Sequence, residues 1–167
     1  TADVTFFPDT LSLHCEPHHV LAAIRVAQSQ GLSAGIAPPV CCGRPLISRG
    51  FLDEARLQAE SLVKALSPLV QAHRPIVFLE PGCWSAVIDD LPHLVSPSTR
   101  ESATEVARSC RTFEQWAADV LPEPSEPPTN DETVLHHGHC HQKALAGTGP
   151  ALEAIRRGGG CSKDLDS

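Results

Sequence analysis

The stretch Ile76-Val77-Phe78-Leu79-Glu80-Pro81-Gly82-Cys83-Trp84 indicates the fold class most clearly. Its first four residues form a continuous apolar run, which is typical of a parallel β-strand covered by helices on both faces. A proline, a glycine and a cysteine follow at the end of this run. In open α/β sheets, ligands bind at the carboxyl ends of the strands. We therefore expect a buried strand with Cys83 just past its end, at the edge where ligands bind.

The segments before this strand alternate between strand and helix patterns. A β-rich run at 4–7 ends in the turn residues Pro8-Asp9-Thr10, and a helical pattern follows from Pro17 to Gly31. A short strand is expected at 33–36. From residue 52 the apolar positions recur every 3.6 residues until Arg74-Pro75. This order predicts an α/β fold, a parallel sheet flanked by helices.

The chain also repeats itself after about 130 residues. The helix pattern at 20–25 returns at 151–156, and a strand pattern at 134–137 precedes it. We expect two Rossmann-like repeat units, of which the second is incomplete. The first unit, with its following helix, spans 1–121, a linker rich in proline and acidic residues spans 122–131, and the second unit spans 132–167. That following helix is expected from an apolar stripe at 106, 110, 113, 117 and 120, with Cys110 in the core.

Composition excludes several function classes. The formal charge is −7 with no basic run, which argues against a nucleic-acid partner. No apolar run approaches eighteen residues, so no membrane-spanning segment is expected. The sequence contains no methionine, and we expect it to be a piece of a longer polypeptide. A cytoplasmic location is expected, with a peripheral position at the inner face of the membrane as an alternative.

The stretch Cys41-Cys42-Gly43-Arg44-Pro45 predicts a loop that presents two sulfur atoms together, because neither a regular strand nor a helix points two adjacent side chains into one core. The chain has seven cysteines, and thiolates at strand ends suit an iron-sulfur cluster or a zinc ion. Cys41, Cys42, Cys83 and Cys140 are the candidate metal ligands. Adjacent cysteines are unusual zinc ligands, so an iron-sulfur cluster is the leading hypothesis and zinc the alternative.

Other residues are weaker candidates for a site. Arg44, His139 and His141 are expected either to support the metal-binding cysteines from just outside the site or to contact a substrate. The histidines at 14, 18 and 19 are expected on an exposed helix start. Cys15 and Cys161 are expected in loop-like surroundings, either as additional metal ligands or without a role in the site. No catalytic residue can be assigned from spacing.

Four stretches resemble the cysteine-rich CCG domains. They are Phe7-Pro8-Asp9-Thr10, the segment 41–56, Leu79-Glu80-Pro81-Gly82-Cys83, and His137-Gly138-His139-Cys140-His141-Gln142-Lys143-Ala144-Leu145. Such domains occur in heterodisulfide reductase, in iron-sulfur subunits of glycolate oxidase and anaerobic glycerol-3-phosphate dehydrogenase, and in lactate-utilisation proteins. The chain is most similar to the C-terminal region of FAD-linked D-lactate or D-2-hydroxyacid dehydrogenases.

The resemblance implies electron transfer. A 4Fe-4S type cluster would carry electrons from a flavin domain or subunit of the same enzyme to a quinone or protein acceptor, with FAD bound outside this chain. Thr10 and Ala86 stand where the first and last cysteines of the family's pattern are found. These departures favour a second hypothesis, a zinc-stabilised or metal-free domain that docks a partner subunit. A third is direct substrate binding by Arg44, His139 and His141.

Overall fold

The computed structural model describes residues 2–125 and 133–165. The chain divides into two compact units, Thr1–Thr112 and Phe113–Ser167. The predicted linker lies partly on residues 126–132, outside the described residues. The expected boundaries at 121 and 132 therefore stay a prediction, although the observed division places the helix at 113–120 with the second unit.

The first unit is built around a four-stranded parallel sheet, as expected. Its strands are β1 (Val4–Phe7), β2 (Ala34–Ile36), β3 (Ile76–Phe78) and β4 (Cys110–Thr112), in the order β2-β1-β3-β4. The central strands β1 and β3 pair in register from Thr5 with Ile76 to Phe7 with Phe78. Both strands are buried along their whole length. The continuous apolar run at 76–79 thus forms the strand that its pattern predicts.

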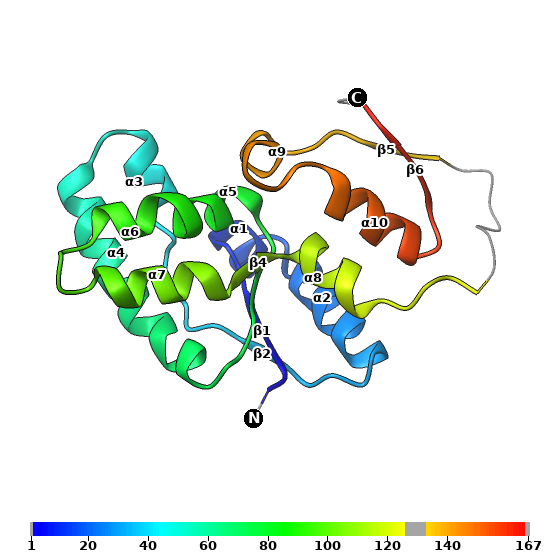
Figure 1. The fold of residues 1–167 in the computed structure, drawn as a ribbon, viewed down its shortest axis with the longest axis horizontal. Helices are drawn as coiled ribbons and strands as arrows, with labels where there is room; N and C mark the ends of the chain where they lie inside the picture. The colour runs from blue at the N-terminus through cyan, green and yellow to red at the C-terminus, as the bar shows by residue number, and fades with distance from the viewer. Residues whose placement is uncertain (1, 126–132, 166–167) are drawn as a thin grey trace. The chain divides into compact units, whose positions relative to one another are not determined.

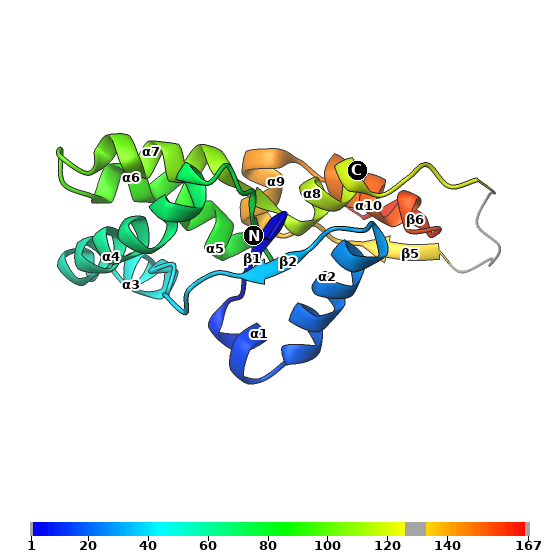
Figure 2. The same cartoon turned by 90° about the horizontal axis from the view of Figure 1, so that it is seen from below.

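Helices lie in each connection between the strands of the first unit. They are α1 (Thr10–His14), α2 (Pro17–Ser29), α3 (Arg44–Ser48), α4 (Leu52–Gln71), α5 (Pro81–Ser85), the π-helix η1 (Ala86–Asp90), α6 (Leu91–Leu94) and α7 (Arg100–Ser109). Within this unit, α4, α6 and α7 lie together on one side of the strands and α2 lies on the other (Figures 1 and 2). The sheet is therefore covered on both faces, which explains why its central strands read as unbroken apolar runs.

The core of the first unit combines aromatic side chains from the strands with aliphatic ones from α4. Phe7 and Phe78 stack with ring centroids 4.4 Å apart. Leu62 and Leu66 of α4 are completely buried, as the helical period predicted. Burying a leucine side chain contributes about 1.5–3 kcal/mol. This packing fixes the positions at which β1 and β3 end.

One expected helix is wrong. The stripe at 106, 110, 113, 117 and 120 was interpreted as a single helix, but α7 ends at Ser109 and residues 110–112 form β4. Cys110 pairs with Ile76 and Thr112 pairs with Phe78, so pairing with β3 overrides the local helical spacing. Cys110 is buried, as expected, although it lies on a strand.

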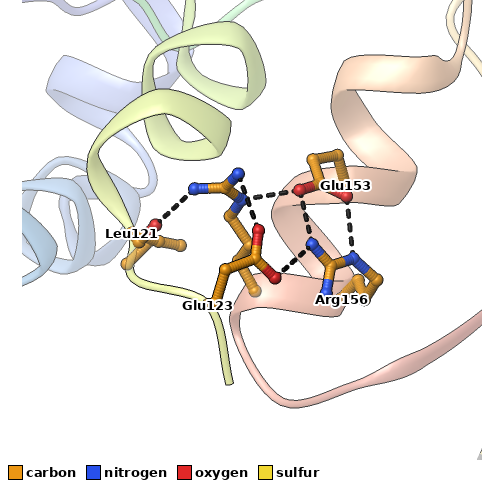
Figure 3. A network of polar contacts seen from close by, with 5 residues as sticks. Leu121, Glu123, Glu153 and Arg156 are labelled. Carbon is orange, nitrogen blue, oxygen red and sulfur yellow. Dashed lines mark hydrogen bonds and ion pairs between the residues drawn. The ribbon is translucent and has the colours of Figure 1, made fainter. Parts of the chain in front are cut away.

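The second unit contains α8 (Phe113–Val120), β5 (Thr133–His136), α9 (Cys140–Ala146), α10 (Gly149–Arg157) and β6 (Cys161–Asp164). Strands β5 and β6 pair in parallel, and α8 packs against α10. A cluster of charged side chains joins α10 to the chain after α8. Arg156 and Arg157 each bind both Glu153 and Glu123, and Arg157 also donates to the carbonyl of Leu121 (Figure 3).

No helix among residues 2–125 and 133–165 combines the length and the apolar character needed to cross a bilayer.

Candidate functional site

Two of the predicted ligands meet in the first unit. Cys42 lies in the loop after β2, and Cys83 lies in the first turn of α5, just after β3. Their Sγ atoms are 2.9 Å apart, and both side chains are buried. Parallel strands place their carboxyl ends at one edge of a sheet, and the loop after β2 passes the end of β1 to bring these residues, 41 positions apart, into contact. The pairing of the double-cysteine loop with the end of β3 is the central feature of the site.

The loop conformation turns backbone amides toward the sulfur atoms. Gly43 has a φ of +84°, a left-handed conformation that favours glycine over residues with a Cβ. Its N–H lies 3.4 Å from the Sγ of Cys41, and the backbone N–H of Arg44 bonds the Sγ of Cys42. Hydrogen bonds of this kind stabilise thiolates and tune the potential of sulfur-bound metals. The glycine of the Cys-Cys-Gly sequence therefore allows the backbone turn that brings N–H groups close to the two sulfurs.

The three candidate ligands of the first unit, Cys41, Cys42 and Cys83, line one cavity of about 100 Å³. Its wall also includes Thr10 and His14, from the start and end of α1. Cys41 is the exposed member of the three, and its carbonyl accepts a hydrogen bond from Gln58 on α4. The cavity thus presents three cysteines at the carboxyl edge of the sheet.

The helix that carries Cys83 is fixed at its start by Glu80. The Glu80 carboxylate accepts hydrogen bonds from the backbone N–H groups of Gly82, at 2.8 Å, and Cys83, at 2.5 Å. Side-chain caps of this type satisfy donors that a helix N-terminus leaves unpaired. The hydroxyl of Ser85 also donates to the carbonyl of Gly82. The sequence placed Cys83 just past a strand end, and the structure shows that a capped helix begins there.

Arg44 joins the two cysteine-bearing segments. Its Nε donates to the carbonyl of Gly82 at 3.3 Å, and its Nη2 donates to Ser85 at 3.1 Å and to Asp90 at 2.6 Å. All three acceptors belong to the segment 82–90, which contains Cys83, while Arg44 follows Cys42 by two positions. Arg44 therefore connects the loop after β2 to the segment after β3. Because its charge is paired with Asp90, this contact supports a positioning role more than a substrate contact.

The contact between the two sulfurs shifts the pKa values of the two thiols in opposite directions. The hydrogen bond with Cys83 lowers the pKa of the Cys42 thiol, against the opposing effect of burial. The same contact and burial raise the pKa of Cys83. Thiolates are the species that bind metals and act as nucleophiles, so Cys42 is the better donor of the pair. Burial alone raises the pKa of Cys110, which has the environment of a core residue.

The remaining predicted residues lie in the second unit. Cys140 is the first residue of α9 and is exposed, and the rings of His139 and His141 stack with centroids 5.5 Å apart. That Cys140 shares a centre with Cys41, Cys42 and Cys83 stays a prediction. The two cysteines expected in loops are both exposed. Cys15 follows α1, whereas Cys161 is the first residue of β6 and does not lie in a loop.

The donor chemistry of the cavity fits a thiolate-bound metal, because three cysteines surround one space and backbone amides point at two of their sulfurs. The positions of these side chains do not yet form a complete metal site. Among residues 2–125 and 133–165, no three histidine, cysteine, aspartate or glutamate side chains stand close enough together to hold an ion. Of the three cysteines, Cys42 and Cys83 are in direct contact, and Cys41 lines the same cavity.

Sequence reasoning missed His14 as a cavity residue. It was expected on an exposed helix, and it is exposed, but it also lines the cavity with the three cysteines. No signal in the sequence indicated it, because turn residues were expected at 8–10. In the structure, His14 lies four positions after Thr10 on α1, and residues at this spacing share a helix face. Thr10, at a position where the CCG pattern that this chain resembles has a cysteine, lines the cavity too, whereas Ala86 is buried within η1.

Comparison with known proteins points to oxidoreductases. The chain is 26% identical, over 92% of its length, to a subunit of the anaerobic glycerol-3-phosphate dehydrogenase of Escherichia coli (strain K12). It is similar to a dehydrogenase subunit. It is also 25% identical, over 71% of its length, to lactate utilization protein A of Oceanobacillus iheyensis. The chain spans only 39% and 48% of these two proteins. No family model matches the chain.

Proposed function

We propose that the chain is the cysteine-rich electron-transfer part of an iron-sulfur oxidoreductase. The observation that carries the proposal is the meeting of Cys42 and Cys83, with Cys41, around one cavity at the carboxyl edge of the sheet. The similarity to a dehydrogenase subunit and to a lactate utilization protein supports the same class of reaction. A resemblance to CCG domains supports the iron-sulfur identity of the centre.

In this proposal, Cys41, Cys42 and Cys83 hold the cluster and Cys140 completes it. An iron-sulfur cluster supplies one-electron transfer when bound. The chain's own contribution is the placement of its sulfurs. The amides of Gly43 and Arg44 stabilise negative charge on the sulfurs, and the Arg44 side chain keeps the two cysteine segments together.

The finer proposal is that electrons reach this chain from FAD bound elsewhere in the same enzyme, after oxidation of a 2-hydroxyacid of the D-lactate or glycolate type. A quinone or another protein then accepts them. The name of lactate utilization protein A supports a hydroxyacid, whereas that of the glycerol-3-phosphate dehydrogenase names a polyol phosphate as an alternative substrate class. Turnover assays of the full-length protein with both classes distinguish them.

Anaerobic reconstitution with ferrous iron and sulfide tests the cluster directly. We expect a brown protein that contains iron and acid-labile sulfide in equal amounts and gives an electron paramagnetic resonance signal after reduction. Serine at positions 41 and 42 should abolish all three properties while circular dichroism stays unchanged. A colourless protein that retains only zinc would contradict the proposal.

A second function is favoured by Thr10 and Ala86, which stand where the CCG pattern has its first and last cysteines. Here the chain is a zinc-stabilised or metal-free domain that docks a partner subunit. The same serine variants separate the two functions. Loss of turnover with the fold intact supports electron transfer, and global unfolding supports a structural metal.

A further inference from the structure

The contact between Cys42 and Cys83 has chemical consequences that require no metal. Their sulfurs are 2.9 Å apart, and a disulfide bond requires about 2.05 Å. The two residues lie on separate segments, 41 positions apart, so a small displacement of one segment would bring the sulfurs to bonding distance. Two sulfurs in contact are sufficient for a disulfide, whereas a metal centre needs further ligands.

The surroundings hold these two sulfurs face to face. Cys83 is fixed by the Glu80 cap of α5, and Cys42 precedes the residue that caps α3. Arg44 ties the two segments through Gly82, Ser85 and Asp90. None of these contacts uses the sulfur of Cys42 or Cys83.

The burial of the two sulfurs favours a small oxidant. The cavity's volume of about 100 Å³ accommodates only a few water-sized molecules. Hydrogen peroxide is small enough to enter such a space, whereas a peptide disulfide such as oxidised glutathione is much larger. Cys42 and Cys83 are 7% and 9% exposed, so both side chains have little contact with molecules outside the cavity.

We propose that Cys42 and Cys83 form a peroxide-sensitive thiol pair, which closes a disulfide whenever the cavity holds no metal. One sulfur attacks the peroxide, the O–O bond breaks, and the departing oxygen leaves as water while a sulfenic acid forms. The second sulfur attacks the sulfenic sulfur, the S–O bond breaks, and a second water leaves as the S–S bond forms. The two thiols lose two electrons and two protons in total, and one peroxide becomes two waters.

The disulfide would have a direct effect on the cavity. It removes two of the three cysteine sulfurs that line it, so an oxidised chain cannot take up a thiolate-bound metal. A thiol reductant restores both sulfurs by exchange. The pair would thus protect the empty site from irreversible oxidation. This proposal is separate from the electron-transfer function because it concerns the metal-free chain.

The test uses the 167-residue chain, reduced and freed of metal with a chelator. After peroxide treatment we expect the thiol content to fall by two from the seven present, and peptide mapping without reduction to find a Cys42–Cys83 cross-link. Dithiothreitol should reverse both changes. Oxidised glutathione at the same concentration should act at least tenfold more slowly. The variants Cys15→Ser and Cys161→Ser, which change exposed cysteines, should form the cross-link at the rate of the parent chain.

Three outcomes would overturn the proposal. They are a cross-link that joins Cys41 to either partner instead, sulfinic acid at Cys42 without any cross-link, and equal rates with glutathione and peroxide. The cross-link is mapped in the unsubstituted chain, so the result does not depend on whether a cysteine variant folds. Iron content after reconstitution is measured separately, and its failure would count against the electron-transfer function alone.

Discussion

Replacing Arg44 with alanine should loosen the site without removing any ligand. The change deletes hydrogen bonds to Gly82, Ser85 and Asp90. Hydrogen bonds to charged groups contribute about 1.5–3 kcal/mol when buried, and exposed ion pairs contribute about 0–1 kcal/mol. The Arg44 and Asp90 side chains are 21% and 31% exposed, between these limits. We expect a loss of about 1–2 kcal/mol in the free energy of unfolding of the first unit.

Urea unfolding followed by tryptophan fluorescence measures this loss. Trp84 follows Cys83 directly and is buried in the first unit, whereas Trp116 reports on the second. A Trp116→Phe background therefore restricts the signal to the first unit, which matters because two units need not unfold together. In the same background, Arg44→Ala should also lower iron uptake on reconstitution, because the cysteine segments are less well held.

A matched control is available on α4. Arg56 pairs with Asp53 at 3.3 Å, and both side chains are largely exposed. Arg56→Ala should change the free energy of unfolding by less than about 0.5 kcal/mol. A double-mutant cycle between Arg44→Ala and Asp90→Asn should give a coupling energy of about 1 kcal/mol. A coupling of zero, or an Arg44 variant as stable as the Arg56 variant, would refute the positioning role.

Three further perturbations test the site, the core and the charged cluster. Cys42→Ser should reduce iron bound after anaerobic reconstitution to below about a tenth of the parent's, measured by elemental analysis, because serine is a poor ligand for iron-sulfur clusters. Leu62→Ala in the core should cost about 2–5 kcal/mol in urea unfolding, and the exposed Leu57→Ala less than about 0.5 kcal/mol. Hydrogen bonds with Arg156, then Arg157, lower the pKa of Glu153 from 4.5 to about 2. Its contribution to stability is therefore present above pH 4.5 and lost as the pH falls through 2, and carboxyl NMR titration of Arg156→Gln should return its pKa toward 4.5.

The sheet could be predicted from the sequence wherever the strands are apolar throughout. The run at 76–79 and the residues at 4–7 are mostly apolar or β-branched, and this composition indicates strands buried on both faces. The strand at 110–112 has no such composition. Cys110 lies four positions after Val106, the spacing of residues on one helix face, so the sequence indicated a helix there. The conformation of this strand is decided by pairing with β3, more than thirty residues earlier in the chain. This pairing therefore cannot be predicted from the residues next to 110–112 in the sequence.

The site shows the same division between local and distant causes. That Cys42 and Cys83 lie at the same edge follows from one rule, the shared edge of parallel strands. Their direct contact does not follow from it, because β1 lies between β2 and β3. The groups that control the two sulfurs could not be inferred in this way either. Arg44 reaches Asp90 only because η1 continues the helix begun by Glu80, and His14 lines the cavity only because α1 follows directly from β1. Patterns of cysteine spacing therefore identify which sulfurs lie at one edge, and the contacts of their neighbours determine whether those sulfurs bind a metal or each other.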